Sequence, residues 1–295
     1  MTEALAWDRD GRDWPNREAS RFVRAAGLLW HVQIMGDGPA LLLVHGTGSS
    51  THSWRALAPL LARHFTVVAP DLPGHGFTEM PSTQRLSLPG MANAVADLLG
   101  TLDIVPALAA GHSAGAAILA RMSLDGRIAP SGLVSLNGAL LPLYGLPGIV
   151  FAPLARVLAG MPLMSQMFAW HASERSVVEK LLRDTGSTLD PAGVALYAKL
   201  ARNPVHASAA LGMMANWDLE PLVEALPRLK PALLLVVGAN DLTIAPEEAA
   251  RVRQLLPKAK LLSQPGLGHL AHEEAPKPTA ALVVQFGCDV QVLPT

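Results

Sequence analysis

A serine at position 113 lies in the pentapeptide GHSAG (residues 111–115), which has the pattern G-x-S-x-G. A strand-like run (residues 107–110) precedes it, and a helix-like run (residues 116–124) follows it. A sharp turn from strand to helix needs glycine on both sides of the serine, because side chains there would clash as the backbone reverses direction. Such a turn lifts the hydroxyl clear of a sheet, so Ser113 is predicted to be a nucleophile.

A serine hydroxyl is a poor nucleophile at neutral pH, so it needs a base and a group that orients the base. After a serine of this kind, the expected order is Asp or Glu and then His. Asp241 ends the segment GAND after the apolar run 233–237, and His269 lies in the segment GLGH after the run 260–262. We therefore predict a triad of Ser113, His269 and Asp241. The alternatives are a helix N-cap for Asp241 and an ordinary loop position for His269.

Catalysis at an acyl group also needs donors for the oxyanion that develops in the transition state. The apolar run 40–44, typical of a parallel strand covered on both faces, leads into the segment HGTGS (residues 45–49). We predict that the backbone amides of Thr47 and Ala114 form the oxyanion hole. The alternative is an ordinary glycine-rich turn. A phosphate loop is not favoured, because no Gly-Lys-Ser/Thr follows.

Composition excludes several classes of function. Of the 295 residues, 50% are hydrophobic and 16% are charged, and the formal net charge is −1. The balance allows a large core and offers no basic surface for nucleic acid. Cys288 is the single cysteine, which excludes an internal disulfide and favours a reducing compartment. Residues 1–20 show no signal-peptide pattern, so we expect a cytoplasmic protein.

No metal and no cofactor is expected. His269 and His272 have the spacing H-x-x-H, which differs from the i, i+4 spacing of a helical zinc site and comes without a third ligand. The segment DLPGHG (residues 71–76) is interpreted as a turn that supports the site, and His75 as a structural residue.

Strand-like and helix-like runs alternate along the chain, which predicts an α/β fold with a mostly parallel, doubly wound sheet. An antiparallel hairpin (21–25 and 29–34) opens the chain. The remaining predicted strands are 41–44, 65–69, 107–110, 132–136, 233–237 and 260–262, and the predicted helices are 53–63, 88–102, 114–124, 246–255 and 270–286. Because ligands bind at the carboxyl ends of such strands, the predicted site residues fall at one edge of the sheet.

Residues 139–216 are predicted to form a helical cap inserted after the sixth strand, over a core made of residues 1–138 and 217–295. The insertion is rich in methionine, which adapts to bulky apolar ligands. A large hydrophobic pocket is therefore predicted; the alternative is that the same side chains only pack the cap onto the core. The predicted substrate-binding residues are Met161, Met164, Phe168, Trp170, Met213 and Met214.

Residues 143–170 carry one charge, Arg156, in 28 residues. Pro147, Pro153 and Pro162 divide this segment, so it is not expected to span a membrane. Because this segment is so apolar, we predict that it forms either a peripheral membrane contact or a homodimer interface.

Five segments together resemble α/β-hydrolases: HGTGS, DLPGHG, GHSAG, GAND and GLGHLAHEE. Three further segments, at residues 10–18, 133–140 and 212–219, are similar to the BchO-type proteins, which are magnesium-chelatase accessory proteins of bacteriochlorophyll biosynthesis. The resemblance runs from about residue 10 to 274. It implies an α/β-hydrolase fold, a photosynthetic bacterium, a tetrapyrrole context and a candidate contact with magnesium chelatase, but no particular reaction.

The combined hypothesis is a serine hydrolase acting on an ester or similar acyl bond of a bulky hydrophobic substrate, a tetrapyrrole intermediate such as a magnesium porphyrin. One alternative is a non-catalytic porphyrin-binding accessory to magnesium chelatase, and another is a carbon–carbon bond hydrolase. Haloalkane dehalogenases and epoxide hydrolases are excluded, because Ser113 stands where they use aspartate. Candidate porphyrin contacts are Arg156, Lys199 and Arg202 for propionates and His171 or His206 for magnesium, although both histidines fit surface positions better.

Overall fold

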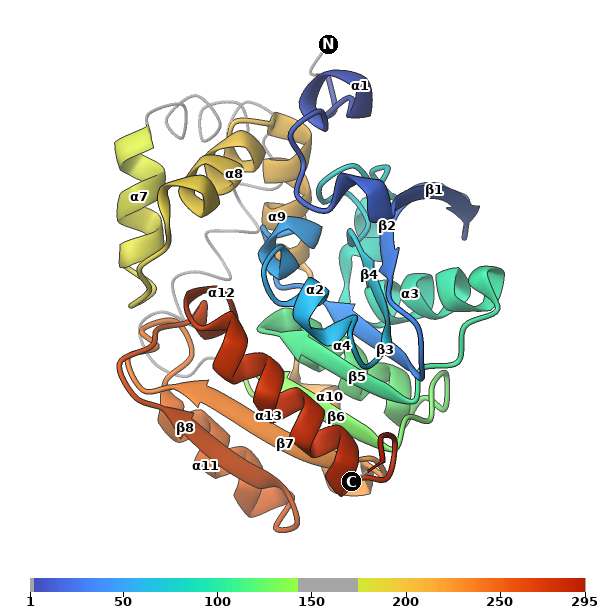
Figure 1. Cartoon of the computed structure of the whole chain (residues 1–295), viewed down its shortest axis with the longest axis vertical. Coiled ribbons are helices and arrows are strands. Elements are labelled where there is room, and N and C mark those ends of the chain that lie inside the picture. Colours follow the sequence, from blue (N-terminus) through green and yellow to red (C-terminus); the bar gives the residue numbers. More distant parts are fainter. Residues whose placement is uncertain (1–2, 143–174, 295) are drawn as a thin grey trace.

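The computed structural model describes residues 3–142 and 175–294, and these contain one eight-stranded sheet (Figure 1). The strand order is β1-β2-β4-β3-β5-β6-β7-β8. The pairs β1–β2 and β2–β4 are antiparallel, and all the others are parallel. The strands are β1 (Ser20–Ala25), β2 (Leu28–Met35), β3 (Ala40–Val44), β4 (Thr66–Pro70), β5 (Leu108–His112), β6 (Gly132–Leu136), β7 (Ala232–Gly238) and β8 (Lys260–Gln264).

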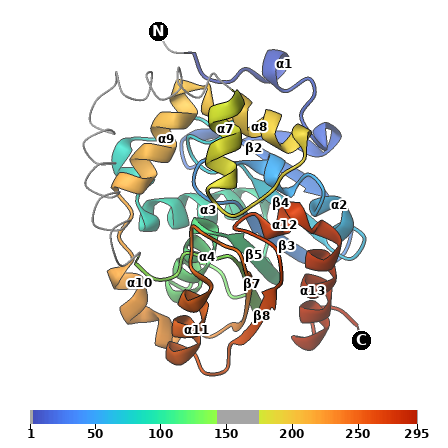
Figure 2. The same cartoon turned by 90° about the vertical axis from the view of Figure 1, so that its left-hand side faces the viewer.

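Helices cover both faces of the sheet (Figures 1 and 2). Alternate residues of a strand face opposite sides, and in β3 the pair Leu42 and Val44 packs into one core while Leu41 and Leu43 pack into the other. The first core includes residues of α3 (Leu88–Leu102), α4 (Ala114–Leu124), α10 (Glu220–Ala225) and α11 (Pro246–Leu255). The second includes residues of α2 (Ala58–Leu61) and α13 (Pro276–Asp289). The predicted doubly wound α/β fold is confirmed.

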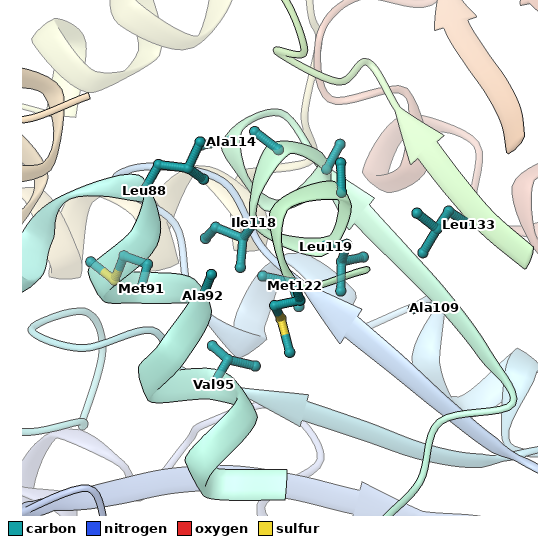
Figure 3. Packing of buried hydrophobic residues seen from close by; sticks show 14 of the residues in the cluster. Leu88, Met91, Ala92, Val95, Ala109, Ala114, Ile118, Leu119, Met122 and Leu133 are labelled. Carbon is teal, nitrogen blue, oxygen red and sulfur yellow. The ribbon is translucent and has the colours of Figure 1, made fainter. Parts of the chain in front are cut away.

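The first core is built where α3 lies against α4. Figure 3 shows Met91 and Val95 of α3 facing Ile118 and Met122 of α4, and Ala109 of β5 belongs to the same cluster. Small residues on α4 and β5 let the backbones approach closely. This packing fixes α4, and therefore the turn that precedes it, against the middle of the sheet.

Two predicted helices are shorter than expected, and proline explains one of them. The run 270–286 divides into α12 (Ala271–Glu274) and α13, because Ala275 precedes Pro276 and has the extended φ of −133° that a residue before proline favours. In place of a helix over 53–63, the chain forms the 3-10 turn η2 (Thr51–Trp54), capped by the Ser50 side chain, and then α2. The other short elements are α1 (Trp7–Asp10), η1 (Arg17–Ala19), η3 (Thr83–Leu86) and η4 (Leu226–Arg228).

Residues 175–215 form three helices, α7 (Arg175–Arg183), α8 (Pro191–Ala201) and α9 (Pro204–Ala215). They lie beyond the end of the sheet from which the loops after β3 and β4 emerge (Figure 1). Contacts with Ser49 and Gly76 place α8 and α9 directly on these loops. The predicted division into core and cap stays a prediction, because residues 143–174 lie outside the described residues.

Candidate active site

Ser113 occupies a strained turn between β5 and α4. Its φ is 51° and its ψ is −120°, a backbone conformation that is costly for a residue with a side chain. A Cβ at Gly115 would lie 2.0 Å from the carbonyl oxygen of Val44, and one at Gly111 would lie 2.5 Å from the nitrogen of Ala116. Glycine is therefore required on both sides of the serine. Ser113 itself keeps partial exposure to solvent.

Asp241 and His269 form a buried pair at the same edge of the sheet. The distance from His269 Nδ1 to Asp241 Oδ2 is 2.8 Å. The other carboxylate oxygen accepts the amides of Thr243 and Ile244 at 2.8 and 2.9 Å. Asp241 thus holds the turn that precedes α11, but it is not the N-cap of that helix, which is Ala245 and has no side-chain cap. Because Nδ1 is the nitrogen that donates to the carboxylate, Nε2 is left as the basic nitrogen of His269.

His112, which precedes Ser113 in the chain, contacts His269. The distance from His112 Nε2 to the carbonyl oxygen of His269 is 3.0 Å, and the two imidazole rings lie 4.7 Å apart. Within the described part of the chain, Ser113 Oγ makes no hydrogen bond to His269. Nucleophile–base hydrogen bonds are often long until substrate binds, so this geometry is compatible with a triad.

Asn137 is a site residue that the sequence reasoning missed. It lies at the end of β6, and its Nδ2 donates to Asp241 Oδ2 at 2.8 Å and to the Gly268 carbonyl at 3.3 Å. Its φ is 47°, a left-handed conformation that asparagine tolerates better than most residues. The available signal was an Asn-Gly pair at the carboxyl end of a buried strand, the same position in the sheet as the other site residues.

The loop after β3 packs directly on the turn that carries Ser113. A Cβ at Gly46 would lie 2.9 Å from Ser113 Cβ, so glycine permits the close approach. Gly48 adopts a left-handed φ of 73°. Among residues 3–142 and 175–294, neither the Thr47 amide nor the Ala114 amide donates to another group, which leaves both of the predicted oxyanion donors available.

Buried histidines surround the site without adding charge. Burial, followed by the nearby His272 and His269, holds the pKa of His112 well below its usual value. Burial lowers the pKa of His272 to about 3 and also lowers that of His75. These rings are neutral at physiological pH, which agrees with the structural role predicted for His75. Within the described residues, no three His, Cys, Asp or Glu side chains are grouped so as to hold a metal ion.

The predicted substrate-binding residues fall in different places. Met213 is fully buried, and its Sδ accepts a hydrogen bond from Thr47 Oγ1 at 3.5 Å, so it contacts the predicted oxyanion loop. Met214 is 39% exposed. The remaining four, Met161, Met164, Phe168 and Trp170, lie outside the described residues, and so do Arg156 and His171.

The structure corrects two of the candidate porphyrin contacts. Lys199 is engaged by the N-terminal segment, where its Nζ donates to Asp13 Oδ1 at 2.7 Å and to the Asp10 carbonyl at 2.9 Å. His206 was expected at the surface but is buried, with the Gly76 amide on Nδ1 and the Gly48 carbonyl on Nε2. No nitrogen of His206 remains for magnesium. Arg202 lies at the C-terminal end of α8.

Comparison with known proteins shows the class to which this chain belongs. Residues 41–282 match the model of the alpha/beta hydrolase family, and the chain belongs to this family. The chain is 37% identical over 276 residues to the "Magnesium-chelatase 30 kDa subunit" of Rhodobacter capsulatus, an alignment that covers 93% of this chain and 96% of that protein. The resemblance to the BchO-type branch is thereby confirmed.

Solved structures agree on the fold. An alpha/beta hydrolase fold protein from Burkholderia ambifaria superimposes with a TM-score of 0.77 and 25% identity, covering 90% of this chain and 97% of that one. A putative lipase from Acinetobacter baumannii AYE gives a TM-score of 0.79 at 20% identity, and the superposition covers 99% of this chain and 98% of that one. In the described part of the chain, no helix combines the length and the apolar composition needed to cross a bilayer.

Proposed function

We propose that this protein is a serine hydrolase that cleaves an ester or a similar acyl bond. The observation that carries the proposal is the buried Asp241–His269 pair at the sheet edge where the strained turn presents Ser113. In this mechanism His269 Nε2 takes the proton of Ser113 Oγ as the oxygen attacks the acyl carbon. The amides of Thr47 and Ala114 stabilise the oxyanion. His269 then protonates the leaving group, and water releases the acyl product.

Replacement of the nucleophile tests the proposal. We expect Ser113→Ala to reduce turnover of short p-nitrophenyl esters by at least about a thousandfold with an unchanged fold, and to abolish labelling by a fluorophosphonate. Ser123→Ala is the matched control, because Ser123 lies near the other end of α4 and its hydroxyl has no partner in the described residues. Equal turnover by Ser113→Ala and the wild type would end the proposal.

The substrate we propose is a bulky hydrophobic ester, specifically a tetrapyrrole such as an esterified magnesium porphyrin. Support comes from the name of the relative in Rhodobacter capsulatus and from the methionine-rich composition of residues 139–216. The contact of Met213 with Thr47 brings a residue of that insertion beside a predicted oxyanion donor. Burial of a flat macrocycle contributes about 25 cal/mol per Å² before entropic costs.

Spectral titration tests the proposed substrate. Magnesium protoporphyrin and its monomethyl ester, added to the protein, are expected to shift the Soret band and quench tryptophan fluorescence, and the ester is expected to yield the free acid by mass. No spectral change at tens of micromolar protein would contradict the tetrapyrrole proposal, while ester turnover on small substrates would survive it.

A second candidate function is a porphyrin-binding accessory that contacts magnesium chelatase without catalysis. The observation in its favour is the printed description of the 37% identical relative as a subunit of that enzyme. Under this function, Ser113→Ala retains the spectral shift and still stimulates the chelatase reaction in a reconstituted assay. Loss of both effects on mutation would instead favour hydrolysis.

For residues 143–170 we propose peripheral membrane association or a homodimer interface, based on their single charge. Flotation with liposomes and sedimentation of the lipid-free protein separate the two. A monomer that does not bind liposomes would contradict both.

A further inference from the structure

Three successive residues of the loop after β3 each contact a different side chain from the helices α8 and α9. Thr47 Oγ1 donates to Met213 Sδ at 3.5 Å. The carbonyl oxygen of Gly48 lies 3.1 Å from His206 Nε2. Ser49 Oγ lies 3.3 Å from Tyr197 Oη. Each residue between Gly46 and Ser50 is therefore in contact with a side chain of α8 or α9.

His206 makes the most constrained of these contacts. The Gly76 amide donates to its Nδ1 at 3.1 Å, so Nε2 is the protonated nitrogen and donates to Gly48. Burial lowers the pKa of His206 to about 4, which keeps the ring neutral at physiological pH, and the Gly76 amide selects its tautomer. The imidazole thereby joins the loops after β3 and β4 through one buried side chain.

Tyr197 joins the same loop to the segment that carries His269. Its hydroxyl donates to Glu273 Oε1 at 2.8 Å, which leaves Ser49 as the donor in the contact between Ser49 and Tyr197. Glu273 follows His269 by four residues and also forms an ion pair with Arg55. A chain of contacts thus runs from the predicted oxyanion loop through α8 to α12.

We propose that His206 and Tyr197 are positioning residues. Through their contacts with Gly48 and Ser49, they hold the loop after β3 so that the Thr47 amide points at the developing oxyanion. This inference rests on the proposed hydrolase function. Gly46 and Gly48 flank Thr47, and glycine allows many backbone conformations. A displacement of the order of 1 Å in a catalytic group costs about a hundredfold in rate, so such a loop needs external contacts.

Two substitutions at position 206 separate hydrogen bonding from packing. His206→Leu removes both hydrogen bonds, whereas the amide of His206→Gln can donate to Gly48 and accept from Gly76. We expect His206→Leu and Tyr197→Phe each to lower kcat on p-nitrophenyl acetate by about tenfold while KM changes less than twofold, because one oxyanion donor supplies a factor of 10² to 10³. His206→Gln should recover most of the lost kcat.

Leu200→Ala is the matched control for stability. Leu200 lies on α8, is fully buried against Trp14 and Phe77, and makes none of the loop contacts. It is expected to lower Tm more than Tyr197→Phe does and to leave kcat unchanged at 25 °C. If kcat instead fell in proportion to Tm across the four variants, His206 and Tyr197 would have only a structural role, and the inference would fail.

Amide hydrogen exchange of the peptide containing residues 46–50 gives a readout that does not depend on activity. We expect faster exchange in His206→Leu and Tyr197→Phe and wild-type exchange in His206→Gln and Leu200→Ala. Unchanged exchange in the first two variants would overturn the inference. Loss of the proposed function would look different, because the wild type and Ser113→Ala would then turn over esters equally while the exchange pattern stayed as expected.

Discussion

Asn137 donates to the same oxygen of Asp241 that binds His269, so one carboxylate oxygen serves two neighbours. Hydrogen bonds to a charged group contribute about 1.5–3 kcal/mol. Without the Asn137 amide, Asp241 Oδ2 keeps His269 as its only partner among the described residues, while Oδ1 stays bound to the amides of Thr243 and Ile244, so the carboxylate holds the imidazole less firmly. We expect Asn137→Ala and Asn137→Gly to lower kcat on small esters by about tenfold each.

The comparison of the two variants separates the side chain from the backbone. Position 137 has a φ of 47°, where alanine is strained by about 1–2 kcal/mol and glycine is not. Asn137→Gly should therefore unfold at higher urea than Asn137→Ala, with the same kcat. Wild-type kcat in the glycine variant would show that the amide does not support Asp241.

The residues named from sequence are those whose types are dictated by backbone geometry or by chemistry. Glycines 111 and 115 are required by clashes with neighbouring backbone, and the order Ser, Asp, His follows from the sheet topology. Asn137, Tyr197 and His206 were missed or misassigned, because their roles depend on contacts between segments far apart in the chain. Periodicity and local motifs carry no information about such contacts.

Helices were predicted with their bounds where the sequence marks where each helix begins. Helices 88–102, 114–124 and 246–255 have the predicted bounds, because each lies on a covered face of the sheet and has a clear beginning. The runs 53–63 and 270–286 failed as single helices: the second is broken before Pro276, and the first gives way to a capped 3-10 turn before α2. The helices α7 to α9 could be expected from composition, but not their docking on the loops after β3 and β4.

The junction between β5 and α4 gives a prediction at the scale of an element. Gly115→Ala would place a Cβ 2.0 Å from the Val44 carbonyl, a clash with backbone that cannot move without displacing β3. We expect this variant to be destabilised by several kcal/mol, as for severe overpacking, and to lose activity. The measurement is thermal unfolding followed by circular dichroism.

Gly100→Ala is the control, because Gly100 lies inside α3 and a Cβ there meets nothing within 4 Å. Alanine is favoured over glycine in a helix by about 1 kcal/mol, so Tm should rise. A Gly115→Ala variant as stable as the wild type would mean that the turn can rearrange.

At the scale of the whole molecule, a buried carboxylate away from the predicted triad contacts several distant segments. Asp71 follows β4 and lies 2.7 Å from His31 of β2 through Oδ2 and Nδ1. It also accepts the amide of Thr51 at 2.6 Å and that of Phe77 at 3.0 Å. One side chain thus joins the antiparallel edge of the sheet, the turn η2 and the loop that contacts His206. Asp71 is the first residue of the segment DLPGHG, which is interpreted from the sequence as a supporting turn.

The stability of the protein in acid should depend on protonation of Asp71. Burial by itself raises the pKa of Asp71, but His31 and the backbone amides more than offset it and hold the pKa well below the usual 3.8. The unfolded chain therefore takes up the proton first, so this contribution is present above about pH 4 and lost as the pH falls below it. At pH 7, Asp71→Asn should lower the free energy of unfolding by about 3–5 kcal/mol, as for a broken buried pair, and should therefore unfold at a lower urea concentration. Between pH 5 and 3 its free energy of unfolding should fall less steeply than that of the wild type, and parallel curves would contradict the role given to Asp71.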